Sequence, residues 1–395
     1  FCSTSNPCKG PVSAANSLVG SSTNNYVGSG SIYTLPAGGF IIAIIGWDNG
    51  TQTDTGAVRF CSAWDTCYGV ISESNSLVGS HSYDYVGSAI FVLSNGDFLV
   101  RSPDWDDGSI VDAGAVTFCS VSSSCHGAVS YSNSLIGEHA SDHLSSGGII
   151  SLENGRYVVL NPKWDRGNTE DAGAATYCTS GDCSGYVSLS NSLVGSSSED
   201  EVGQRGVSLY NGNYLVLSPD WDGSGVNLGA ATWCSGTGGC DGEVTSGNSL
   251  VGSTNGDGLE LDAIASSDAN NALVMWPNWD NGGVVNAGAV KWCGASSGCE
   301  GALDAGSSLV GTHANDQVGI FGSHMGNARY AVTSYNWNGT ATGAGAVTFC
   351  TNLSGCPGVV SMSNSLVGGS DEDHVGRGSY TWDANALIFS SPDWH

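Results

Sequence analysis

The stretch Gly114-Ala-Val-Thr-Phe-Cys119 is followed by a short polar segment and then by Cys125. Small and bulky side chains alternate up to the first cysteine, a pattern typical of a β-strand. The residues at 127–130, Gly-Ala-Val-Ser, follow the second cysteine. The whole pattern predicts a strand, a tight tip and a returning strand, with a disulfide across the tip.

This unit recurs along the whole chain, and three landmarks count it independently. The segment Asn-Ser-Leu-Val-Gly, or a close variant, starts at Asn16, Asn75, Asn133, Asn191, Asn248, Ser307 and Asn364. A tryptophan, usually followed by aspartate, stands at Trp47, Trp105, Trp164, Trp221, Trp279, Trp337 and Trp394. Cysteine pairs stand at Cys2/Cys8, Cys61/Cys67, Cys119/Cys125, Cys178/Cys183, Cys234/Cys240, Cys293/Cys299 and Cys350/Cys356. Successive copies are 56 to 59 residues apart, so the chain of 395 residues contains seven repeats.

One repeat contains four expected strands, at residues 86–93, 97–102, 114–119 and 127–130. Asn95-Gly96 between the first two is typical of a hairpin turn with positive φ. The Asn-Ser-Leu-Val-Gly segment is interpreted as the link to the next repeat. No helical periodicity of useful length is present.

Seven repeats of four strands predict an all-β fold, a seven-bladed β-propeller of four-stranded antiparallel blades with one hairpin disulfide per blade. Residues 1–395 would form one domain, with the last blade closed by both termini and further chain expected upstream of Phe1. A parallel solenoid is the alternative. The Asn-Gly turns favour the antiparallel blades.

The order of elements resembles the FG-GAP repeat of integrin α-subunit propellers. Val86-Gly87 stands at the Phe-Gly position of that repeat, Ser102-Pro103 at its Gly-Ala-Pro, and Ala113-Gly-Ala-Val116 matches its following strand. The units also resemble repeats of secreted bacterial adhesins of the filamentous-haemagglutinin type. Both resemblances imply an extracellular protein that functions in adhesion. The short turn at 94–97 stands where FG-GAP repeats often carry an Asp-rich calcium loop, so no calcium is expected there.

The charge of the chain narrows its possible partners. Ten basic and 37 acidic residues give a net charge of −27. Nucleic acid and anionic membrane surfaces need clustered basic residues, so neither is an expected partner. The longest apolar run, residues 40–47, is far shorter than the roughly 20 residues that span a bilayer, so membrane insertion is not expected. The negative charge favours solubility outside the cell or, alternatively, a surface that gathers cations.

The fourteen cysteines indicate the compartment. Each pair lies within its own repeat, six pairs with five intervening residues and one with four. Zinc sites bring together closer-spaced pairs, so local disulfides are the favoured interpretation. Disulfides persist in oxidising compartments, which predicts an extracellular or cell-surface location.

Several residues in the loops are candidate sites. A polar acceptor stands nine residues after the start of each Asn-Ser-Leu-Val-Gly segment, and either turn capping or ion binding fits it: Asn25, Asp84, Asp142, Asp200, Asp257, Asp316 and Asp373. His81, His139 and His313 share another position, where a surface histidine or a metal ligand is possible. Asp200, Glu201, Asp371 and Asp373 belong to acidic runs and are calcium candidates, the one possible cofactor. Asn49, Asn338 and Asn352 begin glycosylation sequons, and the pair Trp64-Asp65 in a cysteine tip could stack on a sugar or a partner.

No nucleophile elbow, zinc-protease motif, phosphate loop or dinucleotide fingerprint is present in the sequence. We therefore expect a protein that is not an enzyme. The first hypothesis is an adhesion or structural protein that binds a surface protein or glycan, or assembles with itself. The second is a multivalent lectin, and the third a glycan-active enzyme with two carboxylates in one cleft.

Overall fold

The computed structural model describes residues 9–62, 67–123, 125–181, 183–266, 271–294, 299–327, 329–339, 341–350, 356–383 and 386–394. The chain forms two compact units, Phe1–Ser192 and Leu193–His395. Within the described ranges the regular structure is strand, apart from two short 3₁₀ turns at Val27–Ser29 and Glu153–Gly155. None of these described segments is a helix long and apolar enough to cross a membrane.

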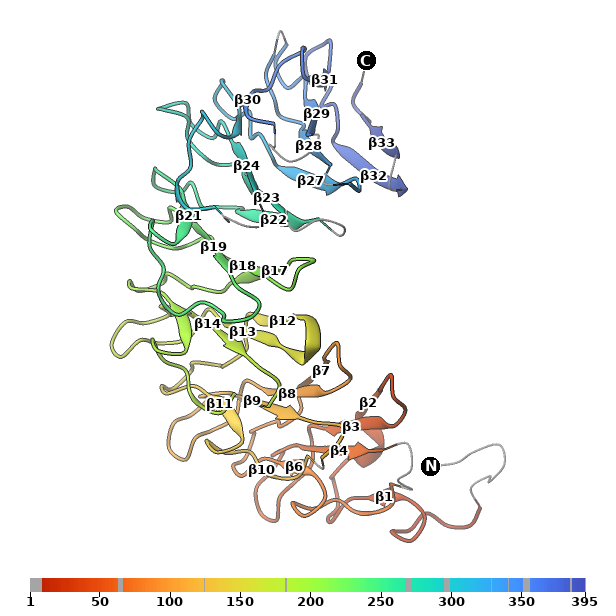
Figure 1. Ribbon diagram of the computed structural model, residues 1–395. Helices are drawn as coiled ribbons and strands as arrows, with labels where there is room; N and C mark the ends of the chain where they lie inside the picture. The colour runs from red at the N-terminus through yellow and green to blue at the C-terminus, as the bar shows by residue number, and fades with distance from the viewer. Residues whose placement is uncertain are drawn as a thin grey trace. The chain divides into compact units, whose positions relative to one another are not determined.

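The first unit contains successive sheets that follow one another along the chain (Figure 1). The first sheet has the order β10-β6-β4-β3-β2, formed by β2 (Ser31–Thr34), β3 (Phe40–Ile44), β4 (Ala57–Cys61), β6 (Leu77–Val78) and β10 (Gly127–Ala128). The second has the order β15-β11-β9-β8-β7, formed by β7 (Ala89–Val92), β8 (Phe98–Ser102), β9 (Ala115–Cys119), β11 (Ser134–Ile136) and β15 (Gly185–Tyr186). Strands β12 (Gly148–Ser151), β13 (Tyr157–Asn161) and β14 (Ala174–Cys178) begin a third sheet, and β1 (Leu18–Val19) pairs with β5 (Gly69–Val70).

The second unit repeats this arrangement. Strand β16 (Ser192–Val194) pairs with β20 (Gly242–Glu243). One complete sheet contains β17 (Arg205–Ser208), β18 (Tyr214–Ser218), β19 (Ala230–Cys234), β21 (Ser249–Val251) and β25 (Gly301–Ala302) in this order. The next contains β22 (Asp262–Ala265), β23 (Ala272–Trp276), β24 (Ala289–Cys293), β26 (Leu309–Val310) and β30 (Gly358–Val359). It is followed by β27 (Phe321–His324), β28 (Tyr330–Ser334), β29 (Ala346–Cys350) and β31 (Ser365–Val367), and by the pair β32 (Gly378–Asp383) and β33 (Ala386–Ser390).

The fourth strand of each repeat was assigned to the wrong segment by the sequence. The Asn-Ser-Leu-Val-Gly segment is itself a strand: Leu135 in β11 pairs antiparallel with Val116 in β9. The segment after the second cysteine, expected as strand four, instead pairs in parallel with the preceding sheet, Gly127 of β10 opposite Leu77 of β6. A complete sheet is therefore antiparallel through four strands and ends in a fifth, parallel strand from the next repeat.

A side-chain turn produces this exchange. Asn133 accepts a hydrogen bond from the backbone N–H of Ser130 at 2.9 Å and donates one to the carbonyl of Ala128 at 2.9 Å. Asparagine turns of this kind reverse the chain locally. The reversal takes the chain out of the preceding sheet at Ala128 and returns it beside β9 at Ser134. The all-β repeat fold is confirmed, whereas one closed seven-bladed domain stays a prediction.

Neighbouring sheets within a unit pack face to face. In the first unit, one buried cluster joins Ile41 of β3 to Phe98 of β8 and Ala115 of β9. The rings of Phe60 and Phe98 approach to 5.8 Å between centroids. Because both faces of such a sheet are covered, its central strands are apolar on both sides, as Phe98, Leu99 and Val100 show by being fully buried.

Six of the seven expected cysteine pairs lie in the described part of the chain, and all six are disulfides: Cys61–Cys67, Cys119–Cys125, Cys178–Cys183, Cys234–Cys240, Cys293–Cys299 and Cys350–Cys356. The first cysteine of each pair ends the third strand of its repeat, as with Cys119 at the end of β9. Cys2 and Cys8 lie outside the described residues. Each of these six disulfides therefore fixes the chain where it passes from one sheet to the neighbouring sheet.

Candidate functional site

A polar residue stands nine positions after the start of each Asn-Ser-Leu-Val-Gly segment, and we call it the capping residue. Its side chain is buried and accepts hydrogen bonds from backbone N–H groups. Oδ2 of Asp142 accepts the backbone N–H groups of Glu138 at 2.8 Å and His139 at 2.9 Å. The six capping aspartates are almost fully buried: Asp84, Asp142, Asp200, Asp257, Asp316 and Asp373. Asp200 and Asp316 make the same pair of bonds in their own repeats. The described residues therefore support turn capping at this position.

This geometry explains why the Asn-Ser-Leu-Val-Gly segment ends in glycine. A Cβ on Gly137 would lie 2.4 Å from the carbonyl oxygen of Ala113 and 2.7 Å from the Cβ of Asp142. Gly79 and Gly311 stand equally close to their own capping aspartates. Only glycine lets the backbone approach the buried carboxylate this closely.

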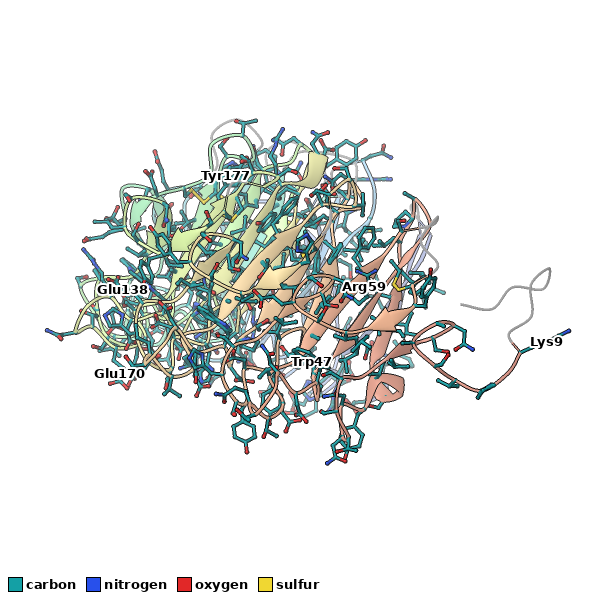
Figure 2. The ribbon with its side chains drawn as sticks, turned by 90° about the horizontal axis from the view of Figure 1, so that it is seen from below. Lys9, Trp47, Arg59, Glu138, Glu170 and Tyr177 are labelled. Carbon is teal, nitrogen blue, oxygen red and sulfur yellow. A yellow bond between two sulfur atoms is a disulfide. The ribbon has the colours of Figure 1, made fainter. Side chains whose placement is uncertain are left out.

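The capping residue also fixes the loop after the tryptophan, here called the Trp-Asp loop. Oδ1 of Asp142 accepts the N–H of Asp165 at 2.9 Å, and Oδ1 of Asp165 accepts the N–H of Asp171 at 2.8 Å. Asp84, Asp106 and Asp112 form the same relay in the preceding repeat. In Figure 2 the exposed residues Glu138, next to a capping turn, and Glu170, in a Trp-Asp loop, lie at one edge of the first unit, outside its strands. We call the capping turns and Trp-Asp loops of a unit its loop edge.

Burial changes the acidity of the capping carboxyls. It raises the pKa of Asp142 to about 6, against the opposing effect of the N–H groups of His139, Asp165 and Glu138. Burial also raises the pKa values of Asp84 and Asp200, again opposed by backbone hydrogen bonds. A carboxylate removed from water binds its proton more tightly because the charged form loses solvation.

These shifts predict a dependence of stability on pH. The folded chain keeps the proton of Asp142 up to about pH 6, whereas an ordinary aspartate releases it near pH 3.8. The folded state thus binds more protons between these values, so this contribution is fully present below pH 3.8 and is lost as the pH rises through 6. We expect a higher thermal unfolding midpoint at pH 4.5 than at pH 7.5, and a weaker dependence in Asp142→Asn. A dependence that is unchanged in this variant would contradict the assignment to Asp142.

Three positions at the loop edge differ between repeats, while the frame around them is constant. They are the residue before the tryptophan, the last residue of the Trp-Asp loop, and the residue after the capping residue. We call them the variable set. One set contains Asp104, Asp112 and His143, whose ligand atoms all lie within 4.8 Å of one another. Another contains Asn278, Asn286 and Gln317, with Nε2 of Gln317 donating to Oδ1 of Asn278 at 3.2 Å.

Sequence reasoning missed the variable set because its members are far apart in the chain. Asp104 and His143 are separated by an entire strand pair and a cysteine tip. A signal was nevertheless available, since these positions vary in charge from repeat to repeat beside invariant tryptophans and glycines. Comparing the repeats column by column would have selected them.

The three predicted histidines, His81, His139 and His313, lie in three different repeats. His139 Nδ1 lies 4.0 Å from Oδ2 of Asp142, and His313 Nδ1 lies 3.7 Å from Oδ2 of Asp316. Ligand atoms of His81, Asp84 and Asp106 lie within 4.8 Å of one another. Each histidine thus lies beside the capping residue of its own repeat.

The predicted calcium residues belong to two separate repeats. Asp200 and Asp373 are capping residues whose oxygens accept backbone N–H groups. Glu201 accepts a hydrogen bond from Gln204, and Asp371 accepts the N–H of Thr342 at 2.8 Å. Calcium at these residues stays a prediction.

Two sequon asparagines are already engaged at the loop edge. Nδ2 of Asn49 donates to the carbonyl of Gly79 at 3.1 Å. Asn338 takes the place of the Trp-Asp aspartate, with Nδ2 donating to Oδ1 of Asp316 at 3.1 Å. A glycan on either nitrogen would have to replace these bonds. Asn352 and the pair Trp64-Asp65 lie outside the described residues.

Two pockets in the second unit lie where the Trp-Asp loop is shorter. Five positions separate Asp222 from Asn227, and five separate Asn338 from Gly343, whereas Asp280 and Asn286 are six apart. The longer loops carry a small β-bridge, such as Asn281 with Val284. A pocket of about 490 Å³ lies beside Trp221 and is lined by Ser224, Glu243, Thr245, Ser246 and Ser253 among others. A second, of about 300 Å³, is lined by Asn336, Asn338, Glu372 and His374 among others.

Comparison with known families identifies the repeat. The family described as a repeat of unknown function (DUF5650) matches seven segments: residues 1–29, 34–88, 92–146, 151–204, 208–260, 268–320 and 324–377. The chain belongs to this repeat family. Each DUF5650 segment from 34–88 onward contains one complete variable set, as 92–146 contains Asp104, Asp112 and His143.

Other comparisons are weaker. No curated protein matches the chain. A solved structure, the holo form of the PQQ domain of a pyranose dehydrogenase from Coprinopsis cinerea, is 11% identical over 92% of this chain and 90% of that chain, with a TM-score of 0.28. A similarity at that level carries no argument about the fold or the activity of the DUF5650 chain.

Proposed function

We propose that this chain is a secreted or cell-surface repeat scaffold that acts in adhesion or in building an assembly, and that it is not an enzyme. The contrast between the constant frame and the variable sets at the loop edge carries the proposal. Six buried capping aspartates, six buried tryptophans and six disulfides recur at equivalent positions in the described residues, while the partly exposed positions between them change charge and size. Such a division fits a scaffold that presents different contacts on equivalent loops.

The location of the protein is supported by its disulfides. Six pairs are oxidised in the described repeats. Local disulfides at every repeat are typical of secreted proteins. The net charge of −27 fits a protein that stays dispersed until it meets a specific partner.

Exposed aromatic side chains at the loop edge are natural anchors for a partner. Tyr26 and Tyr83 are 63% and 56% exposed, and the rings of Tyr83 and Tyr85 lie 6.0 Å apart. Tyrosine provides large contact area at low entropic cost, which is why it is enriched at interfaces. These residues occupy the positions where another repeat has Asn315 and Gln317.

The test measures native mass by light scattering over a range of concentrations, together with retention on immobilised glycans and on immobilised copies of the chain. We expect assembly or retention for the wild type and about tenfold weaker interaction for Tyr83→Asn/Tyr85→Gln. Tyr68→Ala, at an exposed tyrosine beside a cysteine tip, is the matched control and should change nothing. A monodisperse wild type that neither surface retains would refute the proposal.

A lectin is the second candidate, favoured by the pocket beside Trp221. Hydroxyl groups and the Glu243 carboxylate line it, which suits the hydroxyls of a sugar. Ser246→Tyr should block the pocket without harming the fold, since Tyr131 occupies the same repeat position. Leu189→Tyr makes the same change in a neighbouring repeat and is the control. Glycan-array binding that survives Ser246→Tyr would exclude this pocket.

A further inference from the structure

The variable set of Asp104, Asp112 and His143 differs from its counterparts in its charge. Nδ1 of His143 lies 3.3 Å from the carbonyl oxygen of Pro103 and 3.5 Å from Oδ1 of Asp104. The side chains of Asp104 and His143 are about two-fifths exposed, at 42% and 37%. The three ligand atoms lie within 4.8 Å of one another. Two carboxylates and an imidazole thus meet at a point that solvent can reach.

In the next repeat, one of the equivalent positions is a positively charged side chain. Lys163 replaces Asp104, and its Nζ lies 2.9 Å from Oδ2 of Asp171, the counterpart of Asp112. In the set of Asn278, Asn286 and Gln317 all three side chains are neutral amides, so no charge needs balancing. The set around His143 has carboxylates at both of these positions instead of a lysine or an amide.

Three carboxylates lie close together at this position. Ligand atoms of Asp104 and Asp112 are within 4.8 Å of each other, and Oδ1 of Asp106 accepts the backbone N–H of Asp112 at 2.9 Å. A bound cation would relieve the repulsion between the carboxylates.

We infer that Asp104, Asp112 and His143 bind a divalent transition-metal ion such as Zn²⁺. An imidazole among the ligands favours zinc-like ions over calcium, which takes six or more oxygens. Ligands of a tetrahedral ion, about 2.1 Å from the metal, stand about 3.4 Å from one another, which partly exposed side chains reach from their present separation by small rotations. Three protein ligands leave a fourth position for water or for a group on a partner molecule.

The chain itself provides substitutions that preserve the fold. Asp104→Asn/Asp112→Asn/His143→Gln copies the amide set, and Asp104→Lys copies the lysine of the next repeat. The control is His139→Ala, which removes a nearby histidine outside the set. All proteins are made without a polyhistidine tag and are kept oxidised so that the cysteines do not bind metal.

The experiment measures bound Zn²⁺ by equilibrium dialysis at pH 7.5, with Ca²⁺ in a parallel series. We expect the triple variant and Asp104→Lys each to lose one equivalent of Zn²⁺ relative to the wild type. Affinity should fall at least tenfold in His143→Gln alone, and His139→Ala should keep the equivalent. An unchanged number of Zn²⁺ equivalents in the triple variant would overturn the site. Binding of Ca²⁺ there as tightly as Zn²⁺ would overturn the assignment to an imidazole-ligated metal.

Discussion

Replacing Asp142 by alanine is expected to lower the free energy of unfolding of the first unit by roughly 4 kcal/mol. The carboxylate is fully buried and accepts three backbone N–H groups, those of Glu138, His139 and Asp165. Alanine would leave all three donors without a partner, and each unpaired buried group costs about 1–3 kcal/mol. The loss should also release the Trp-Asp loop at Asp165, which has no other link to this turn among the described contacts.

Hydrogen exchange gives a local measure of this loss. We expect the amides of His139 and Asp165 to exchange on the order of a thousandfold faster in Asp142→Ala, since about 1.4 kcal/mol corresponds to a factor of ten. Glu170→Ala removes an exposed acid from the same Trp-Asp loop as Asp165, makes none of these hydrogen bonds, and should leave these rates unchanged. The exchange rates in Asp142→Asn should lie between those of the wild type and of Asp142→Ala. Asparagine keeps one acceptor oxygen, as Asn25 does at the capping position of the first repeat. Equal rates in wild type and Asp142→Ala would contradict the capping role.

Replacing Trp105 by alanine should cost about 3–5 kcal/mol, the usual range for removing a buried aromatic side chain. Trp105 is 3% exposed and belongs to the cluster that joins the first two sheets of the first unit. Its backbone also closes the Trp-Asp loop, because its carbonyl accepts the N–H of Gly114 at 2.9 Å. The cavity would therefore open where one sheet packs on the next.

Urea unfolding followed by near-ultraviolet circular dichroism would measure this effect. Trp394 provides the matched control, because it occupies the same repeat position and is 67% exposed in this 395-residue chain. Trp394→Ala should shift the midpoint little, whereas Trp105→Ala should shift it strongly. If the two substitutions shifted the urea midpoint equally, burial of Trp105 would not stabilise the packing between the sheets.

The loop edge shows where prediction from the sequence stopped. The capping aspartates were singled out because a polar residue recurs at a fixed distance before a Val-Gly strand start, which is a local signal. Their third partner, the N–H of the Trp-Asp aspartate, lies 22 or 23 residues away in the chain, as from Asp84 to Asp106. A contact of this kind depends on how two loops meet, and no local pattern predicts it.

The sequence alone determined the repeat number, the cysteine pairing within each described repeat and the all-β class. Each of these depends on short-range patterns, namely side-chain alternation, turn residues and cysteine spacing. Only the tertiary structure decided which segment serves as the fourth strand, because the choice between residues 127–130 and 134–136 depends on the Asn133 turn and on a parallel partner in the preceding sheet. The assembly of Asp104, Asp112 and His143 was also decided there, since side chains 39 residues apart meet only when the capping turn is hydrogen-bonded to the Trp-Asp loop.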